Sequence, residues 1–465
     1  MNPSLPIAEA WQNDGFSADE VLAGPLRISL PRKAVLWTVG AYLILNVGFE
    51  FVRIPPVGPG IPIGELVLAL SLCLISTRIL LPIMAKEVWL LPILVWWGLS
   101  LSRALVDFRS GGIWAFRDAS QAIESLYLIV GFWWASGEMN LQYFVRWLKR
   151  LLMGAAVYGL LLPVSSELQS ISPKVSGIGT GGTPLFFSMA NASILMLWAA
   201  AWLLIDRPGD AKSGLGRDLL AGVMVAVSIA FGQSRETYLQ VLALGAVLML
   251  VRRRAAAKWG ITLMLGTLII AAISISGANL KGREGQKISL DFIAQHFESI
   301  SGTGSADVEG ASAGVSLRIN WWRHIFEQLK SSPQTMVFGL GYGIPLTSFQ
   351  GRTAITREPH NSYISVIGRL GLAGILVWTL MQVSLYYSWW RSFRLCRRMG
   401  WTSDQVNLLI LMIFCLMTLV EAIGEASMEV PFYAIPYYFF FGVVLRYGRF
   451  LRQTAEAQMT EELAS

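Results

Sequence analysis

Long apolar stretches recur along the whole chain and are separated by shorter polar segments. A helix of about 20 apolar residues crosses the roughly 30 Å hydrocarbon core of a bilayer, and tilting or flanking residues let shorter stretches do the same. The pattern therefore predicts an all-α polytopic membrane protein with about 12 transmembrane helices. The predicted spans cover residues 34–51, 61–81, 88–105, 119–136, 148–163, 185–205, 218–232, 237–251, 260–276, 361–385, 405–427 and 430–447.

One polar connection, residues 277–360, is far longer than the others, and a loop of this length is usually functional. Apolar residues at helical spacing predict amphipathic helices over 287–300 and 317–329. The stretch 301–314 between them is rich in Gly and Ser, which is typical of a linker. The predicted layout is an N-terminal segment 1–33, nine spans within 34–276, the loop 277–360, three spans within 361–447 and a tail 448–465.

Composition agrees with a membrane protein. Apolar residues make up 54% of the 465-residue chain and charged residues only 14%, whereas soluble domains carry roughly 25% charged residues. These values exclude a disordered chain and argue strongly against a soluble enzyme. The three cysteines, Cys73, Cys396 and Cys415, form no CxxC pair, so neither a disulfide framework nor a paired-cysteine metal site is expected.

The positive charges indicate an orientation. The net charge is +7, which in a soluble protein would suggest nucleic acid. With the N-terminus in the cytoplasm, 22 Lys and Arg residues fall on inside segments and 14 outside, of which eight lie in the loop 277–360. Long loops count weakly in the positive-inside rule. We therefore expect both termini in the cytoplasm and the long loop on the opposite face, with no nucleic-acid partner.

Polar and glycine residues that suit a ligand site gather between Arg318 and Gly374. Arg318 lies at the start of the Trp-rich predicted helix, and Phe338-Gly339-Leu340-Gly341-Tyr342-Gly343 can turn tightly and approach a ligand. The segment Arg357-Glu358-Pro359-His360-Asn361-Ser362-Tyr363 then leads into the tenth predicted span. Another cation, Arg235, lies in the short outside turn between spans seven and eight.

These motifs resemble a known family. His360-Asn361-Ser362-Tyr363, followed by Arg369-Leu370-Gly371-Leu372-Ala373-Gly374, resembles the signature of the bacterial O-antigen ligase and O-antigen polymerase superfamily. The helix containing Arg318 and Trp322, the Gly-x-Gly-Tyr-Gly turn and the Gln233-Ser234-Arg235 corner are similar as well. Many members carry Glu where this chain has Arg369.

The resemblance implies a metal-independent, GT-C-type glycosyltransferase in the bacterial inner membrane that needs no cofactor. Its donor would be a glycan on undecaprenyl diphosphate at the periplasmic face. Its acceptor would be a sugar hydroxyl of a growing glycan or of lipid A–core, and polysaccharide assembly proteins are possible partners. The reaction would be polymerisation or ligation of O-antigen or exopolysaccharide, with polymerisation slightly favoured by the departure at Arg369. A transporter or flippase of a lipid-linked or anionic solute is the alternative from another class, but inverted repeats are not visible.

The implied reaction assigns roles to three residues. His360 is predicted to be the general base, or the group that orients the acceptor hydroxyl, because histidine titrates near neutral pH. Arg318 and Arg235 are predicted to bind the diphosphate, since guanidinium groups donate bidentate hydrogen bonds to phosphate.

Other positions have two interpretations each. Asn361 orients the histidine or ligand, or caps the next helix, and Tyr342 shapes the donor pocket or only completes a turn. Arg357 and Glu358 flank the proposed base; they either support the site or are only charged residues of the loop. Glu425, spaced with Glu421 and Glu429 at i, i+4 and i+8 on one face of span eleven, binds sugar hydroxyls or pairs with arginines such as Arg369. His296 and His324 are interpreted as interfacial residues on amphipathic helices.

Overall fold

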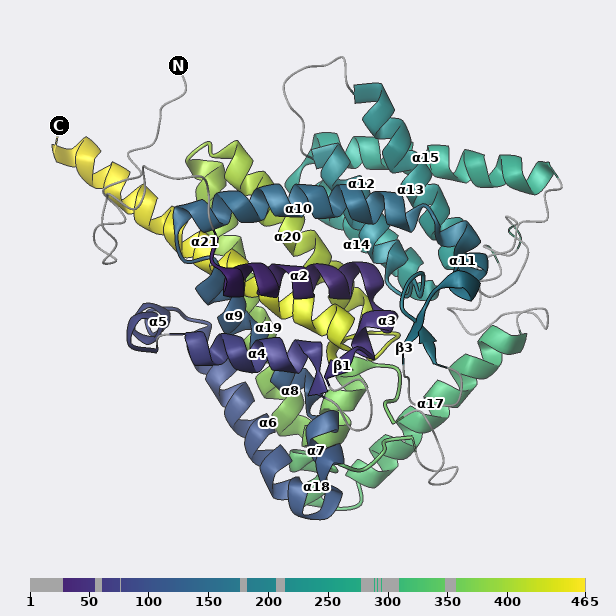
Figure 1. Cartoon of the computed structure of the whole chain (residues 1–465), viewed down its shortest axis with the longest axis vertical. Coiled ribbons are helices and arrows are strands. Elements are labelled where there is room, and N and C mark those ends of the chain that lie inside the picture. Colours follow the sequence, from purple (N-terminus) through teal and green to yellow (C-terminus); the bar gives the residue numbers. More distant parts are fainter. Residues whose placement is uncertain are drawn as a thin grey trace.

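The structure is a computed structural model that describes residues 28–54, 61–75, 77–175, 182–205, 214–276, 309–347 and 357–464, together with positions 288, 291 and 294 (Figure 1). The described part is helical almost throughout. Its helices are α2 (Leu30–Leu45), α3 (Val47–Glu50), α4 (Ile63–Leu74), α5 (Thr77–Met84), α6 (Leu90–Gly111), α7 (Ile113–Asp118), α8 (Ser120–Glu124), α9 (Tyr127–Trp134), α10 (Glu138–Gly159), η2 (Leu162–Val164), α11 (Ser165–Ile171), α12 (Ala192–Ile205), α13 (Gly214–Gly232), α14 (Arg235–Val251), α15 (Arg253–Ile275), α17 (Glu309–Leu329), α18 (Pro333–Phe338), α19 (Ser362–Arg398), α20 (Thr402–Glu421), η6 (Ser427–Glu429) and α21 (Pro431–Ala464). Two antiparallel pairs of two-residue strands complete it: β1 (Arg53–Ile54) with β2 (Ile61–Pro62), and β3 (Lys174–Val175) with β4 (Thr183–Pro184).

Every predicted span overlaps a helix, and the all-α class and the membrane embedding are confirmed. Five helices in the described residues are long and apolar enough to cross a membrane, namely α6, α13, α15, α19 and α20. A sixth span results if the bent pair formed by α10 and the segment Leu162–Ile171 counts as one crossing. The number twelve thus stays a prediction, because several of the predicted spans are short or interrupted helices.

The interruptions have local causes. Asn46 has a positive φ of 33° between α2 and α3, and Gly112 at φ 56° separates α6 from α7. Pro82 lies inside α5, where it cannot donate a helical hydrogen bond. In α19, Gly371 adopts non-helical angles (φ 65°, ψ −158°) and bends the helix within the predicted tenth span. Hydropathy detects the apolar length of such segments but not these breaks.

The centre of the molecule is the close packing of α9 against α21. A Cβ on Gly131 would lie 2.1 Å from the carbonyl oxygen of Phe439, and one on Gly442 would lie 2.1 Å from that of Leu128. Small residues at helix contacts let the two backbones approach in this way. Aromatic rings surround the contact, and Trp134 packs edge-on against Phe439. The resulting core holds the end of α20 and the start of α21 in fixed positions.

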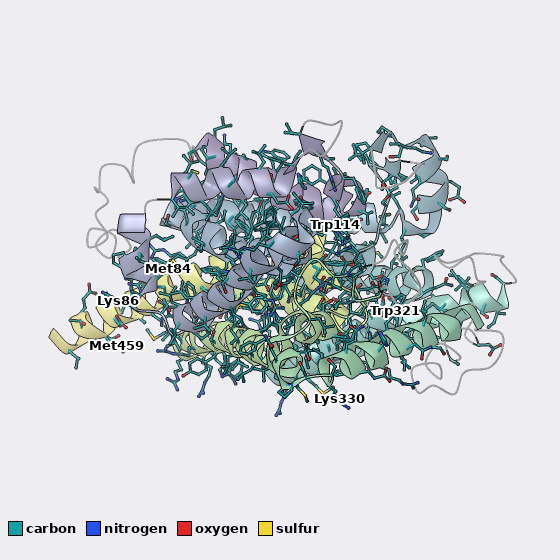
Figure 2. The ribbon with its side chains drawn as sticks, turned by 90° about the horizontal axis from the view of Figure 1, so that it is seen from below. Met84, Lys86, Trp114, Trp321, Lys330 and Met459 are labelled. Carbon is teal, nitrogen blue, oxygen red and sulfur yellow. The ribbon has the colours of Figure 1, made fainter. Side chains whose placement is uncertain are left out.

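The long connection is partly described. Its amphipathic helix is confirmed as α17, but this helix begins at Glu309, so the prediction of a linker over 301–314 is wrong for its last six residues. The predicted helix 287–300, including His296, lies outside the described residues apart from three positions. α17 rests on a small apolar cluster of Ile325, Leu329 and Leu346. Figures 1 and 2 show α17, which carries Trp321, and the end of α21 near Met459 on opposite sides of the molecule.

The three glutamates of predicted span eleven do not share a helix face. α20 ends at Glu421, Glu425 lies in the following turn, and Glu429 ends the 3-10 helix η6. The helix ends here because the chain reverses through Gly424 to begin α21 at Pro431. The prediction of an i, i+4, i+8 stripe is therefore wrong, although the turn still brings Glu421 and Glu425 to one cavity.

Candidate active site

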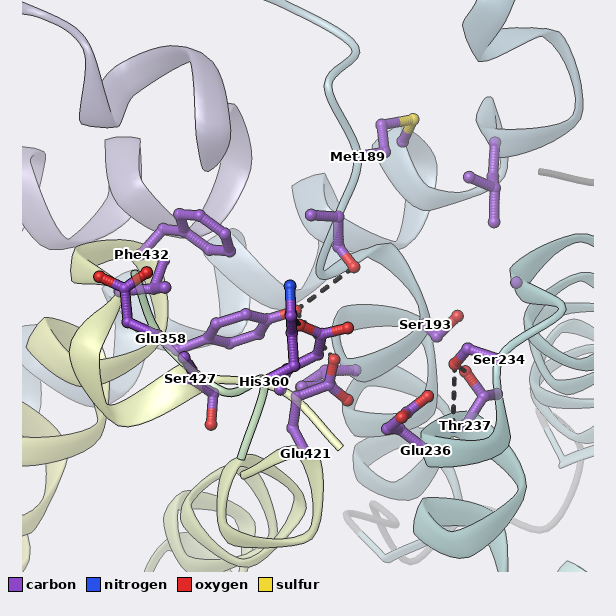
Figure 3. A pocket seen from close by; sticks show the side chains of 18 residues that line it. Met189, Ser193, Ser234, Glu236, Thr237, Glu358, His360, Glu421, Ser427 and Phe432 are labelled. Atoms are coloured by element: carbon purple, nitrogen blue, oxygen red, sulfur yellow. Dashed lines mark hydrogen bonds and ion pairs between the residues drawn. The ribbon is translucent and has the colours of Figure 1, made fainter. Parts of the chain in front are cut away.

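A cavity of about 360 Å³ lies where five parts of the chain meet. These are η2, the start of α12, the corner between α13 and α14, the segment before α19, and the turn from α20 into the start of α21. Figure 3 shows His360 between Glu358 and Phe432 on one side and Ser234, Glu236 and Thr237 on the other. The lining residues are Leu162, Met189, Ala190, Ser193, Ile194, Gly232, Ser234, Glu236, Thr237, Glu358, His360, Glu421, Glu425, Ala426, Ser427, Val430, Phe432 and Tyr433.

His360 is held by a carboxylate and a ring. Its Nδ1 lies 2.7 Å from Oε2 of Glu425. The indole of Trp321 stacks on the imidazole, with ring centroids 6.0 Å apart and an interplanar angle of 18°. Because an ionised carboxylate can only accept, Nδ1 donates its proton and Nε2 is left as the acceptor nitrogen. This arrangement fixes the tautomer that a general base requires.

The backbone at His360 is strained. Its φ is 49°, in the left-handed region that non-glycine residues rarely adopt. Such a conformation costs on the order of 1–3 kcal/mol and is concentrated at functional sites. Gln233, at the other edge of the cavity, has φ 46°. The surrounding structure thus stabilises two unfavourable conformations beside the same cavity.

Glu425 joins His360 to Arg318. The guanidinium of Arg318 donates to Oε1 of Glu425 at 3.0 Å and to the carbonyl of Gly424 at 2.8 Å. Glu236 lies 3.8 Å from the same guanidinium. Burial alone would raise the pKa of Glu425, but the hydrogen bond and charge of His360, together with Arg318, outweigh it and lower that pKa below its ordinary value. Glu425 therefore stays ionised at neutral pH and keeps its contacts with His360 and Arg318.

The glycine-rich turn supports the site through the backbone. Leu340 N–H donates to the carbonyl of Gly368 at 2.8 Å, and Gly341 N–H to that of Arg369 at 3.0 Å. A Cβ on Gly339, at φ 74°, would lie 2.4 Å from the carbonyl of Arg369, and one on Gly371 would lie 2.5 Å from Gly339 N. The glycines thus allow this turn to pack against the bend of α19, and this contact fixes the helix that follows His360.

A buried aspartate forms ion pairs with the two arginines behind the turn. Asp118 is 3% exposed and accepts two hydrogen bonds from Arg357, at 3.1 and 2.9 Å. Arg369, 2% exposed, lies 3.0 Å from the same carboxylate, and Gly343 N–H donates to it at 3.0 Å. Sequence reasoning missed Asp118, although an ionisable residue at the edge of an apolar span is itself a signal. Nearby, burial raises the pKa of Glu429 to about 8, reinforced by Glu358 and opposed by Arg369.

We expect Asp118→Asn to lower the stability of the protein strongly. Removing one partner of a buried ion pair leaves the other charge uncompensated and costs about 3–5 kcal/mol. Thermal unfolding of the detergent-solubilised protein measures the effect. The matched control is Asp218→Asn, which breaks a partly exposed pair with Lys258 at 3.4 Å and should cost at most about 1 kcal/mol. Equal shifts in the two variants would contradict the role of Asp118.

The structure brings only part of the predicted site together. His360, Glu358 and Glu425 line the cavity, and Arg318 contacts it through Glu425. Arg235, partly buried at the start of α14, lies between the lining residues Ser234 and Glu236 but is not itself among the lining residues.

The remaining predicted residues lie elsewhere. Tyr342, Arg357 and Arg369 surround Asp118 or pack behind it, away from the cavity lining. The cap interpretation of Asn361 is confirmed, because its side chain accepts from Ile364 N–H at 3.0 Å. His324 is half-buried on α17, 3.0 Å from the amide of Gln328. Among the described residues, no cluster of three or more His, Cys, Asp or Glu side chains has a metal-binding arrangement.

Comparison with known proteins gives one family match. A family model described as O-Antigen ligase matches residues 220–379. The matched region contains Arg235, Arg318 and His360, whereas Asp118, Glu421 and Glu425 lie outside it. No curated protein matches the chain. The match confirms the resemblance found in the sequence over residues 220–379, from within α13 to within α19.

Proposed function

We propose that the chain is a glycosyltransferase of the bacterial inner membrane. This proposal is supported by the match of residues 220–379 to the family model described as O-Antigen ligase. The protein transfers a glycan from undecaprenyl diphosphate to a sugar hydroxyl at the periplasmic face. The observation that carries this proposal is the contact between His360 Nδ1 and Glu425, 2.7 Å apart in the wall of the cavity. This contact holds an imidazole with one free acceptor nitrogen where an acceptor hydroxyl can reach it.

The proposed step is a displacement at the anomeric carbon of the donor sugar. The acceptor oxygen forms the new glycosidic bond while the bond from the anomeric carbon to the diphosphate oxygen breaks. The electron pair of that bond leaves with the lipid diphosphate, and the hydroxyl proton moves to Nε2 of His360. Glu425 stabilises the imidazolium that forms, and positioned bases of this kind contribute about 10²- to 10⁴-fold to a rate.

The leaving group needs positive charge. Arg318 supplies a guanidinium that Glu425 and the Gly424 carbonyl orient from one edge. Its side chain remains 29% exposed, so a phosphate oxygen can still reach it. Arg235, at the start of α14, is proposed as the second diphosphate ligand. Preorganised donors of this kind stabilise developing negative charge in a transition state, and in the proposed mechanism they act without a metal ion or cofactor.

Polymerisation remains the favoured reaction and ligation to lipid A–core the alternative. The departure at Arg369 supports polymerisation only as a family pattern, since this side chain pairs with Asp118 and is absent from the cavity lining. Polymerisation and ligation are therefore distinguished by analysing the reaction products.

Glycan gels and lipid-linked glycan analysis of a deletion strain test the proposal. Loss of a polymerase leaves single repeat units, whereas loss of a ligase leaves long lipid-linked polymer and bare core. Normal glycans together with a transport defect would contradict a glycosyltransferase and favour the transporter.

A further inference from the structure

We propose that Trp322 is a positioning residue for the proposed base. Its indole N–H holds the peptide bond that precedes His360, and this contact keeps the imidazole in the place from which Nε2 can accept a proton. Trp322 is not among the residues that line the cavity, so it acts on the reaction through His360. The inference rests on the proposed function and adds a residue to its machinery.

The backbone of His360 needs an external hold. Its φ of 49° lies in a region that residues with a Cβ rarely adopt. The ring of Pro359 fixes that residue's own φ, so the plane of the peptide between the two residues is set by ψ of Pro359 and φ of His360. If that plane turns, φ of His360 changes with it, and the direction of the Cα–Cβ bond that carries the imidazole is no longer fixed.

Trp322 fixes this plane from the side of α17. Its Nε1 donates a hydrogen bond to the carbonyl oxygen of Pro359 at 2.9 Å. Pro359 is buried, and a buried carbonyl that loses its partner costs about as much free energy as a lost hydrogen bond. The indole therefore favours the one orientation of the peptide that places its carbonyl at Nε1, and this is the orientation found together with the left-handed φ of His360.

The chain after His360 is held from the opposite side. Nδ2 of Asn361 donates to the carbonyl of Ile423 at 2.7 Å, and the N–H of Ser362 donates to that of Ala422 at 2.9 Å. Both carbonyls belong to the turn that follows α20, which also carries the carboxylate bound to Nδ1. A strained conformation persists where its surroundings over-determine it. Here α17 holds one flank of His360 and the turn after α20 holds the other.

The contacts that α17 makes with this region differ in what they hold. Arg318 binds the carboxylate of Glu425, Trp321 stacks on the imidazole, and Trp322 binds the backbone before His360. Loss of the indole N–H at Trp322 leaves the first two side chains in place. The expected result is a misaligned base beside an intact diphosphate ligand, which lowers kcat and spares the donor KM.

Trp322→Phe tests this expectation, because it keeps an aromatic ring and removes the donor. We expect kcat to fall about 10- to 100-fold, as a small misplacement of a catalytic group does elsewhere, with the donor KM within about twofold of the wild type. Trp389→Phe is the matched control. Trp389 is a half-buried residue of α19, outside the cavity lining, whose indole also donates to a main-chain carbonyl, that of Leu408 at 3.2 Å. Its kcat should stay within about twofold.

The tautomer of His360 gives a second readout that needs no substrate. The chain has three histidines, so solid-state ¹⁵N NMR of the full histidine-labelled protein in lipid vesicles resolves few signals, and His360→Ala assigns the one of interest. At alkaline pH, where imidazole is neutral, the wild type and Trp389→Phe should show a protonated Nδ1 and an unprotonated Nε2. Trp322→Phe should show shifts averaged between the two tautomers. If this variant does not fold, 3-benzothienylalanine at position 322 replaces the N–H by sulfur in a ring of the same shape.

Three results would overturn the inference. These are a kcat within twofold of the wild type in the folded Trp322 variant, equal losses in the Trp322 and Trp389 variants, and a lower kcat with the wild-type tautomer at His360, which would leave Trp322 a packing role only. Failure of the proposed function is recognised separately. Transfer at the wild-type rate in His360→Ala would refute the base, whatever the NMR signals of the Trp322 variant show.

Discussion

Replacing His360 with alanine is expected to lower the rate of glycan transfer by a factor of about 10² to 10⁴, the usual contribution of a positioned general base. The variant loses the group that takes the acceptor proton. The backbone strain at φ 49° is unchanged, because alanine carries a Cβ as histidine does, and Glu425 keeps its ion pair with Arg318. Protein stability should therefore stay close to that of the wild type while transfer fails. Initial rates with a lipid-linked glycan donor and the purified protein measure the effect.

His324→Ala is the matched control for this experiment. This histidine lies on α17, hydrogen-bonds Gln328 and is not among the residues that line the cavity. We expect its transfer rate to stay within about twofold of the wild type, as for a surface substitution away from the site. Transfer at the wild-type rate in His360→Ala would remove the base from the mechanism, whatever the control shows.

Replacing Arg318 with alanine is expected to lower the rate by about 10²- to 10³-fold, as removal of one preorganised donor to a developing anion does elsewhere. The substitution removes the proposed diphosphate ligand and one of the two side chains that contact Glu425. Arg318→Lys should recover only part of the loss, since an ammonium keeps the charge but not the planar pair of donors. Rates measured at saturating donor, with the donor KM, separate binding from turnover.

Arg323→Ala provides the comparison on the same helix. Arg323 is an exposed residue of α17 outside the cavity lining, so its removal tests whether any positive charge on this helix supports the reaction. We expect no more than a small change in the donor KM. Equal losses in the Arg318 and Arg323 variants would indicate general attraction of an anionic lipid and would contradict a specific diphosphate contact.

The helices were largely predictable from the sequence because their apolar length is a property of consecutive residues. Their breaks were not, since these depend on single residues in particular surroundings. Gly371 bends α19 because the turn containing Gly339 packs against it, a contact between distant segments. α20 similarly ends at Glu421, although the apolar pattern continues for several residues.

The candidate site was predictable where its residues lie close together in the sequence. His360, Glu358 and Arg318 belong to or flank motifs that sequence reasoning singled out, and Glu425 was found by its charge near an apolar span. Asp118 was not found, because its partners Arg357 and Arg369 are more than 200 residues away in the chain. The meeting of Glu236 and Glu421 at one cavity was also hidden, since these residues come together only when α14 and α20 pack side by side.

The most direct test counts two products in one reaction. Purified wild-type protein and His360→Ala are reconstituted in vesicles with a lipid-linked glycan donor and its acceptor. Free undecaprenyl diphosphate and newly glycosylated acceptor are then quantified together. We expect one lipid diphosphate released for each glycan transferred by the wild type, and a rate at least about 100-fold lower for both products in the variant. Movement of the intact donor across the membrane without diphosphate release, or equal rates in the two proteins, would refute the proposed glycosyl transfer.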